Sequence, residues 1–362
     1  MDARQAGQAA RSWVEAEIAA GRWPGLRAAH LVGGITSMPP TEPFPAAKDV
    51  DLHLIFAEGS PALAGEGPLS GILEASFGGI AIEAGLKSVA DYRSPEVVLA
   101  NPEIAHHLTG DVVLYDPDGL LRDLQPPVRR GYPRRRWVRA RLDHEQRGQA
   151  GALEMLRLAR ASWGASAEVN LLGYSTTFAT AALQVAALDP PRMGSRSLLR
   201  LGESLAAHDR GDLYEEILAV LGVATADRAT AERLLAEAIE AFDLATTIQR
   251  PTEAFGPFQH KLHRHLRPYF VDSCRSLLAE GFHREALGWV LPYHLATADV
   301  ILTDGPAAAR PVFAARQTAL LRVLGLDTAE ARASAAARAT RTYDRIFVLA
   351  EEIIAAHPGV VD

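Results

Sequence analysis

The run from Asp49 to Phe56 (DVDLHLIF) constrains the fold of this chain most. Apolar residues occupy every second position from Val50 onward, which predicts a β-strand with one buried face. Asp49, Asp51 and His53 share the opposite face. Aspartate is a poor strand former, so two of them in one short strand favour a functional role. Carboxylates at positions i and i+2 of a strand lie roughly 6–7 Å apart and can converge on one or two hard cations.

A glycine pair precedes this strand. The apolar run 27–32 predicts a first strand that stops at Gly33-Gly34, and a proline-rich loop over 35–47 leads to Asp49. This order resembles the nucleotidyltransferases of the DNA polymerase beta superfamily, especially the small-molecule branch that includes the aminoglycoside nucleotidyltransferases. The resemblance implies that the glycine pair lies beside a triphosphate and that Asp49 and Asp51 hold magnesium. The loop is a little longer than is usual in that family, and Lys48 stands where a serine often precedes the first aspartate.

The glycine pair and the residues after it are the expected nucleotide contacts. Glycine lets backbone N–H groups approach phosphate oxygens, so Gly33 and Gly34 are assigned to the phosphates. The hydroxyls of Thr36 and Ser37 are candidates for a further contact. The segment is not a P-loop, since no G-x-x-x-x-G-K-[ST] sequence is present. His53 is interpreted as a structural histidine rather than a nucleotide contact.

The resemblance also implies a third carboxylate on a neighbouring strand. The candidates after Asp51 are Glu58, Glu66, Glu74, Glu83 and Asp91. Glu83 is the only one that falls inside a predicted strand, over 78–86, and small residues flank it on its own face. Glu74 is expected on a short helix over 68–76, and Asp91 lies just past a strand end. We therefore expect Glu83 to complete the metal site and to act as general base.

Composition narrows the class of protein. The chain has 362 residues, 48% hydrophobic and 22% charged, with a formal net charge of −7. These values are typical of a globular protein long enough for two domains, and the acidic balance argues against general nucleic-acid binding. No apolar run reaches the roughly 18–20 residues that span a bilayer. The single cysteine, Cys274, excludes an intramolecular disulfide, so we expect a reduced cytoplasmic setting and a buried Cys274.

The two parts of the chain differ in pattern. Strands over 27–32, 49–57, 78–86 and 111–115, with helices over 3–21, 94–100 and 102–108, predict an N-terminal mixed sheet with flanking helices. Asp116-Pro117-Asp118-Gly119 predicts a turn after the last strand. After about residue 140 the pattern is helical, with helices over about 145–163, 166–187, 195–208, 211–221, 226–248, 257–280, 282–303, 307–323 and 327–356. We therefore expect an α+β fold, with a nucleotidyltransferase domain over 1–140 and an all-helical substrate-binding domain over 141–362.

Two basic segments remain open in function. Seven arginines lie between Arg129 and Arg141, around Tyr132 and Trp137. They are typical either of a clamp for a triphosphate or nucleic acid, or of a solvated hinge between domains, and we favour the hinge. The segment 260–265 (HKLHRH) falls on the predicted helix 257–280. It is interpreted as a solvated helix face, since no further ligands support a zinc site.

These observations lead to one expected function and two alternatives. We expect a magnesium-dependent enzyme that transfers a nucleoside monophosphate from an NTP, ATP first, to a hydroxyl of a small molecule and releases pyrophosphate. The acceptor is expected to be an antibiotic or an intermediate of specialised metabolism. The alternatives are a nucleotidyltransferase toxin or protein-modifying enzyme that acts on a macromolecule, and an inactive nucleotide-binding module. No membrane partner is expected, and the oligomeric state stays open.

Overall fold

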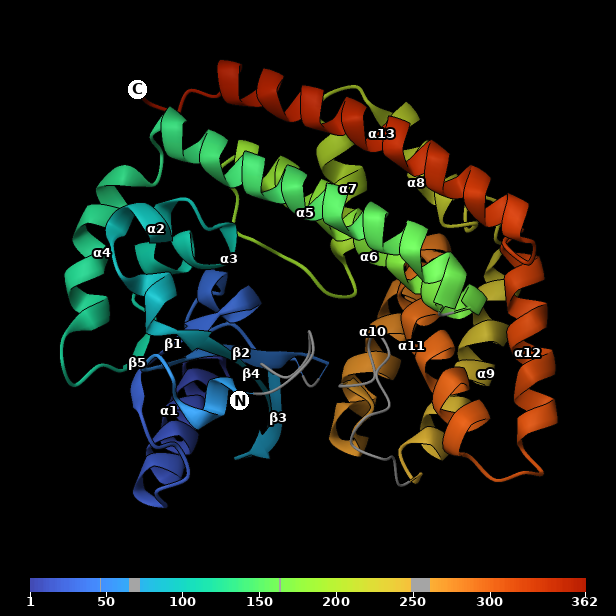
Figure 1. Ribbon diagram of the computed structural model, residues 1–362, viewed down its shortest axis with the longest axis horizontal. Helices are drawn as coiled ribbons and strands as arrows, with labels where there is room; N and C mark the ends of the chain where they lie inside the picture. The colour runs from blue at the N-terminus through green and yellow to red at the C-terminus, as the bar shows by residue number, and fades with distance from the viewer. Residues whose placement is uncertain (46, 65–71, 163, 249–260) are drawn as a thin grey trace. The chain divides into compact units, whose positions relative to one another are not determined.

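The computed structural model describes residues 1–45, 47–64, 72–162, 164–248 and 261–362. By their internal contacts these residues form two compact units. The first comprises Met1–His144, Gln184–Met193 and Ala350–Asp362, and the second comprises Glu145–Leu183 and Gly194–Leu349. The first unit contains a mixed β-sheet with helices and the second is helical, so the predicted α+β fold class is confirmed (Figure 1).

The first unit holds the strands β1 (Leu26–Val32), β2 (Asp49–Phe56), β3 (Ile72–Phe77), β4 (Ile80–Ser88) and β5 (Val113–Tyr115). Its α-helices are α1 (Ala3–Ala19), α2 (Pro95–Leu99), α3 (Pro102–Ala105), α4 (Leu120–Gly131) and the beginning of α5 (Arg135–Ser162). Short 3₁₀ turns complete it: η1 (Gly33–Ser37), η2 (Pro61–Leu63), η3 (Val89–Tyr92) and η4 (His107–Thr109).

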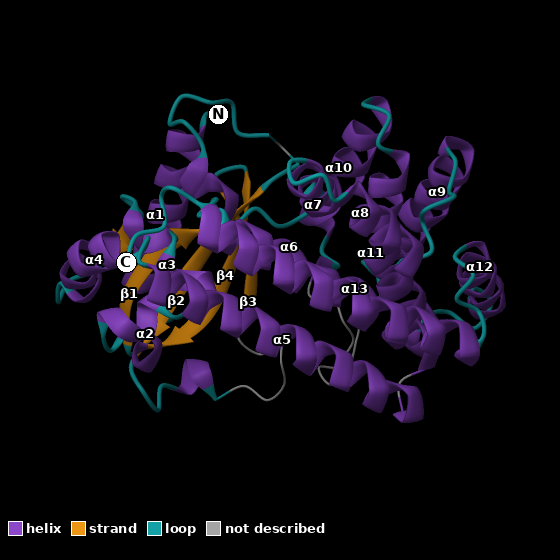
Figure 2. Cartoon of the chain, turned by 90° about the horizontal axis from the view of Figure 1, so that it is seen from above, coloured by secondary structure: helices purple, strands orange, loops and turns teal. Residues whose placement is uncertain are grey.

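The strands form one sheet in the order β3-β4-β2-β1-β5. Figure 2 shows β3, β4, β2 and β1 side by side in this order. β2 and β4 are parallel, and the other neighbouring pairs are antiparallel. The register places Asp51 between Val32 on β1 and Glu83 on β4. Residues paired across neighbouring strands point to the same face, so the register fixes which side chains meet.

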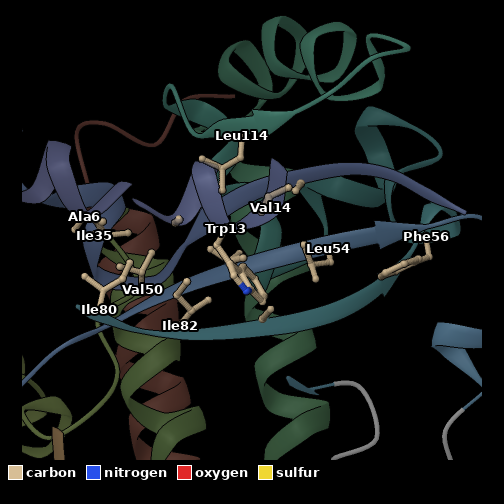
Figure 3. Close-up of a cluster of buried hydrophobic side chains, with 14 residues drawn as sticks. Ala6, Trp13, Val14, Ile35, Val50, Leu54, Phe56, Ile80, Ile82 and Leu114 are labelled. Atoms are coloured by element: carbon tan, nitrogen blue, oxygen red, sulfur yellow. The ribbon is translucent and has the colours of Figure 1, made fainter. Parts of the chain in front are cut away.

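One face of the sheet is apolar and packs against α1. The predicted alternation in β2 is confirmed, because Val50 and Leu54 are fully buried on this face. Figure 3 shows Trp13 and Val14 of α1 directed at the face from which Val50, Leu54 and Ile82 project. Burial of such side chains is the main driving force for folding this unit. The apolar face therefore fixes β2 so that its aspartates point the other way.

The opposite face is apolar only at one end. There Ala28 and Ile55 pack with Tyr92 of η3 and with buried side chains of α2, α3 and α4. Toward the start of β2, the same face carries Asp49, Asp51 and their neighbours on β4. The chain thus divides this face between an apolar core and a polar region.

The structure corrects the expected helix over 68–76. Residues 72–77 form β3, which is joined to β4 by a two-residue turn at Gly78-Gly79. Both glycines have positive φ, 57° and 82°, as the favoured two-residue hairpin turn requires. Residues 65–71 lie outside the described ranges. Glu74 therefore lies on a strand, not on a helix.

The second unit contains the rest of α5, together with α6 (Gly164–Ala186), α7 (Ser197–Ala206), α8 (Gly211–Val220), α9 (Arg228–Ala245), α10 (Arg267–Ala279), α11 (His283–Asp304), α12 (Arg310–Val323) and most of α13 (Ala329–Ala356). Phe270 and Tyr293 stack at 4.2 Å between ring centroids at the contact of α10 with α11. Cys274 is buried as expected, and burial raises the pKa of its thiol. In the described part of the chain, no helix combines the length and apolar character needed to cross a bilayer.

Two further expectations are wrong. The helix expected over 257–280 begins at Arg267 in the described part, since Pro268 starts its first turn and η6 (Arg264–Leu266) precedes it. His260 lies outside the described residues. The segment Arg129 to Arg141 is not a hinge, because it forms the end of α4, a short turn and the first turns of α5, all inside the first unit.

Candidate active site

Three predicted site carboxylates share one face of the sheet. Asp51 on β2 pairs with Glu83 on β4, and Asp49 lies two residues before Asp51 on the same face. Neighbouring strands are about 4.8 Å apart, so the Asp51 and Glu83 backbones are one strand spacing from each other. All three residues are partly buried. The register therefore brings together the carboxylates that the sequence pattern singles out.

A fourth carboxylate, Glu74, lies on the same face of the sheet and completes a row of acids. The sequence analysis placed Glu74 on a helix and did not assign it to the site. Glu74 on β3 pairs directly with Glu83, so Asp51, Glu83 and Glu74 occupy matching positions on three adjacent strands. Both carboxylate oxygens of Glu74 are buried. Like charges directly opposite each other on a sheet are destabilising, so such a row indicates a site for positive charge. The signal that could have located Glu74 is the Gly78-Gly79 pair, which predicts a hairpin that aligns β3 with β4.

Gly33 makes room for Asp51. Its φ is +66°, a conformation that side chains rarely adopt, and a Cβ built there would lie 1.9 Å from Oδ2 of Asp51. The chain therefore turns out of β1 directly against the Asp51 carboxylate. Glycine is needed at position 33 because any side chain there would clash with the Asp51 carboxylate. The sequence alone did not reveal this steric reason.

Gly34 lies next to a lysine. A Cβ built on Gly34 would meet only Nζ of Lys48, at 3.8 Å, so the position has no steric need for glycine. Lys48 is exposed and donates from Nζ to Sδ of Met38 at 3.5 Å. Its ammonium thus lies beside the turn that was assigned to phosphate. Lys48 is a candidate that the sequence analysis noted only as a departure from the family pattern.

The hydroxyl of Thr36 holds the η1 turn together. Thr36 Oγ1 donates to the Gly33 carbonyl at 2.8 Å and lies 3.1 Å from Nδ1 of His107. Since the Thr36 proton goes to Gly33, the Nδ1–H of His107 donates to Thr36. The Ser37 Oγ is buried and has no hydrogen-bond partner among the described residues. Ile35, between them, packs into the core on the α1 face and anchors the turn.

A buried network of two histidines and a tyrosine lies behind the carboxylates. His30 Nδ1 is 2.9 Å from the Leu31 carbonyl, so this nitrogen carries the proton. In neutral His30, Nε2 then accepts from the Tyr92 hydroxyl at 2.8 Å, and His53 Nδ1–H donates to Tyr92 at 2.9 Å. Burial, and secondarily Lys87, lowers the pKa of His30 to about 4. Burial also lowers the pKa of His53 well below its usual value.

This network confirms the structural interpretation of His53. Both imidazoles are neutral near pH 7, so they add no charge beside Asp51. His107 is likewise buried, and burial together with His30 and His106 lowers its pKa well below the usual value. On this face of the sheet, the carboxylates therefore lie at the start of β2, and the neutral, hydrogen-bonded rings of His30 and His53 lie further along the sheet, on β1 and β2.

One further candidate, Asp91, and the acids of the turn after β5 have structural roles. The Asp91 carboxylate accepts the Ser88 backbone N–H at 3.3 Å and caps η3. Asp116, in the turn after β5, accepts the Arg122 backbone N–H at 3.0 Å near the start of α4. Arg27 holds the other acid of that turn, Asp118, at 2.8 Å. The two acids of the turn are therefore engaged by Arg122 and Arg27.

The chemistry of the row fits a hard cation. Its donors are carboxylate oxygens, the ligands that Mg²⁺ prefers, and the register puts Asp51 and Glu83 on neighbouring strands. In the part of the chain that the structure describes, no three His, Cys, Asp or Glu side chains are already gathered as metal ligands. The side chains of Asp49, Asp51 and Glu83 would have to rotate toward a common ion, so their metal role stays a prediction.

Comparisons with known proteins add little to this geometry. No protein-family model matches the chain, and no curated protein matches it in sequence. The fold is similar to a crystal structure of a nucleotidyltransferase-like protein from Exiguobacterium sibiricum 255-15. The TM-score is 0.29 at 11% identity, and the match covers 76% of this chain and 91% of that one. A similarity at this level carries no argument about the activity or the site residues.

Proposed function

We propose that this chain is a nucleotidyltransferase that moves a nucleoside monophosphate from an NTP to a hydroxyl group of a small acceptor. One observation carries the proposal: Asp51 lies between Glu83, its partner on β4, and the Gly33 turn that ends β1. A carboxylate pair next to a turn with a basic side chain is suited to hold a metal–triphosphate complex. ATP is the first nucleotide to test.

The residues that would hold magnesium are Asp49, Asp51 and Glu83. A bound Mg²⁺ supplies positive charge at the phosphate oxygens and lowers the pKa of a coordinated hydroxyl. The apolar packing of β2 against α1 keeps the aspartates at fixed backbone positions. Such preorganised positions are what catalysis by orientation requires.

The turn η1 would bind the phosphates. Among the described residues, only Nζ of Lys48 lies within 4 Å of a Cβ built on Gly34, and this ammonium would pair with phosphate oxygens. The Thr36 hydroxyl is engaged with Gly33 and His107, so its role would be to hold the turn. The buried Ser37 hydroxyl would reach a phosphate only if the turn moves.

Glu83 would accept the proton of the attacking hydroxyl. It is paired with Asp51 on one side and Glu74 on the other, so a cation or cationic acceptor is favoured over a neutral one. An acceptor that carries ammonium groups, as aminoglycosides do, fits this charge. Residues 141–362 are proposed to supply the remaining acceptor contacts.

A thermal-shift screen of the four NTPs, with and without Mg²⁺, tests the first half of this proposal. A ligand at 100 times its Kd stabilises the protein by about 2.7 kcal/mol, so a true co-substrate raises the melting temperature measurably. The Asp51→Asn protein is the control, because it keeps the side-chain shape and loses the charge. Equal melting temperatures in all conditions would contradict NTP binding.

Pyrophosphate release against a panel of hydroxylated cations, neutral sugars and proteins tests the second half. We expect release with a small cationic acceptor and a loss of orders of magnitude in Asp51→Asn. Release that needs a protein acceptor would favour the macromolecule-modifying alternative. Stabilisation by NTP without release from any acceptor would favour a binding module.

A further inference from the structure

The arginine-rich segment forms a cavity that the proposed function does not use. A cavity of about 390 Å³ is lined by Arg134, Arg135, Arg136, Arg139 and Asp362. All five residues belong to the first unit: Arg135, Arg136 and Arg139 lie in the first turns of α5, whose start Figure 1 shows, Arg134 directly precedes them, and Asp362 ends the chain. None of them is among the candidate site residues on the sheet. Four arginines around one cavity repel one another, so their grouping indicates an anionic ligand.

The backbone around this cavity is well held. The Arg135 N–H donates to the Val361 carbonyl at 2.7 Å, and the Val361 N–H donates to the Pro133 carbonyl at 3.0 Å. Arg134 and Val361 form a parallel β-bridge. The arginine side chains therefore project from a fixed frame made of the α4–α5 turn and the segment 360–362, which lowers the entropy cost of binding a ligand.

The positive charge at this place is only partly neutralised. Arg135 pairs with Asp362 at 2.8 Å, and Arg139 pairs with Glu351 at 3.1 Å. Among the described residues, neither Arg134 nor Arg136 makes an ion pair. The exposed Glu96 also interacts with Arg136: the pKa of Glu96 is lowered by hydrogen bonds to its own backbone and to Ser94, and less strongly by Arg136.

Three more facts favour phosphate as the anion. Arginine presents a planar fork of donors that matches phosphate oxygens, and no lysine lines the cavity. No acidic residue stands in the first turn of α5, where the helix dipole favours an added anion. The guanidinium of the exposed Arg136 lies 4.8 Å from the centroid of the Trp137 ring, and a guanidinium plane is a surface on which a base can stack.

We propose that this cavity binds phosphate groups and that their source is a single RNA strand tracking along Arg134 and Arg136. Free polyphosphate carries the same groups without bases, so it is the second source to test. The exposed Arg129 and Arg130 lie at the end of α4, five and four residues before Arg134 in the chain, and Arg129 also donates to the Gly110 carbonyl at 3.2 Å. The net charge of the whole chain is negative and does not reveal this local excess of positive charge. For this reason the composition argued against nucleic-acid binding.

Fluorescence anisotropy with a labelled single-stranded RNA of about 16 nucleotides, the upper range of a single-strand site, tests this proposal. The probe is titrated with the full chain from about 50 to about 200 mM KCl, with tripolyphosphate as competitor. The variant is Arg134→Ala/Arg136→Ala. Its matched control is Arg4→Ala/Arg338→Ala, which removes the same charge at two exposed arginines elsewhere.

We expect the Kd for RNA to rise about tenfold in the Arg134/Arg136 variant and to change little in the control. The slope of log K against log salt becomes shallower by about 1.4, because each phosphate contact on a single strand contributes about 0.7. Tripolyphosphate binding that the same variant weakens, without RNA binding, supports the site and identifies the free source. Equal weakening in both variants, or no binding of either probe to the unchanged protein, overturns the proposal.

The Asp51→Asn protein separates this site from the candidate active site. It should bind RNA at least as tightly as the unchanged chain, because Asp51 does not line the cavity. If Asp51→Asn abolishes RNA binding while Arg134→Ala/Arg136→Ala does not, the phosphates lie at the sheet and the proposal is wrong. A failure of nucleotidyl transfer would leave the cavity proposal intact.

Discussion

At the scale of single residues, the two adjacent glycines differ in what they are needed for. Gly33 has a positive φ and leaves no space for a Cβ beside Asp51, whereas Gly34 has an ordinary φ and open space toward Lys48. A sequence motif treats such a pair as one unit. The structure separates a position that is fixed by sterics from a position that is free to change.

Gly33→Ala is therefore expected to destabilise the fold and to displace the Asp51 carboxylate. The left-handed backbone costs about 1–2 kcal/mol for a residue with a side chain, and the clash with Asp51 adds to it. Urea unfolding should show a loss of at least about 1 kcal/mol, and transfer activity should fall with it. Gly34→Ala is the matched control. Equal stability of the two variants would contradict the assignment of Gly33.

Glu83→Gln tests the general base. Transfer should fall by at least roughly a hundredfold, the usual scale for a lost base, while NTP binding measured by thermal shift largely persists. Asp91→Asn is the control, because the Asp91 carboxylate caps η3 and does not share the Glu83 position. Normal transfer in Glu83→Gln with a loss in Asp91→Asn would show that the third carboxylate is misassigned.

At the scale of elements, sequence patterns predicted β2 well and β3 badly. The alternation in β2 is set by its own buried face, so a period of two was visible in the sequence. The segment 72–77 (ILEASF) contains leucine, glutamate and alanine, which favour helices. It forms a strand because the Gly78-Gly79 turn pairs it with β4. That pairing is a tertiary contact, and local propensity does not contain it.

The buried histidine network predicts how stability depends on pH. The pKa of His30 is about 4 in the folded chain and about 6.5 when unfolded, so between these values the unfolded chain binds more protons. The contribution of His30 alone should then lower the free energy of unfolding by about 1.4 kcal/mol for each pH unit from 6.5 down toward 4. Urea unfolding between pH 7 and pH 5 measures this slope. It should become shallower in His30→Asn, because only the contributions of His53 and His107 remain, and it should be unchanged in His208→Asn, an exposed control.

Arg141 bonds to the ends of two helices, so its replacement is expected to lower the free energy of unfolding strongly. Its buried guanidinium donates to the Leu99 carbonyl at the end of α2, at 3.1 Å, and to the Tyr132 carbonyl after α4, at 2.8 Å. Burial lowers its pKa to about 10, so it stays charged at neutral pH. Arg141→Met should lower the free energy of unfolding by about 3 kcal/mol, since two charge-assisted bonds are lost. The exposed Arg130→Met should change it by less than about 0.5 kcal/mol.

At the scale of the whole molecule, the sequence shows where the pattern of residues changes but not which distant segments contact each other. The change from alternating to helical pattern near residue 140 is local and visible. The return of 184–193 and 350–362 to the first unit is not, because it depends on contacts between segments that are distant in the chain. Arg135 illustrates this, since its partner is Asp362.

Removal of residues 350–362 should unfold the first unit selectively. Ile353, Ile354 and Val360 are buried within this segment, and each buried side chain of this size contributes about 1.5–3 kcal/mol. Their loss removes roughly 5–9 kcal/mol, which is comparable to the whole stability of a domain. Limited proteolysis with mass spectrometry should show new cleavage inside 1–144 in the shortened chain. Deletion of Asp362 alone, which breaks one exposed ion pair, should not change the map. Unchanged cleavage in the chain 1–349 would show that the first unit folds without its C-terminal segment, as the division at residue 140 expects.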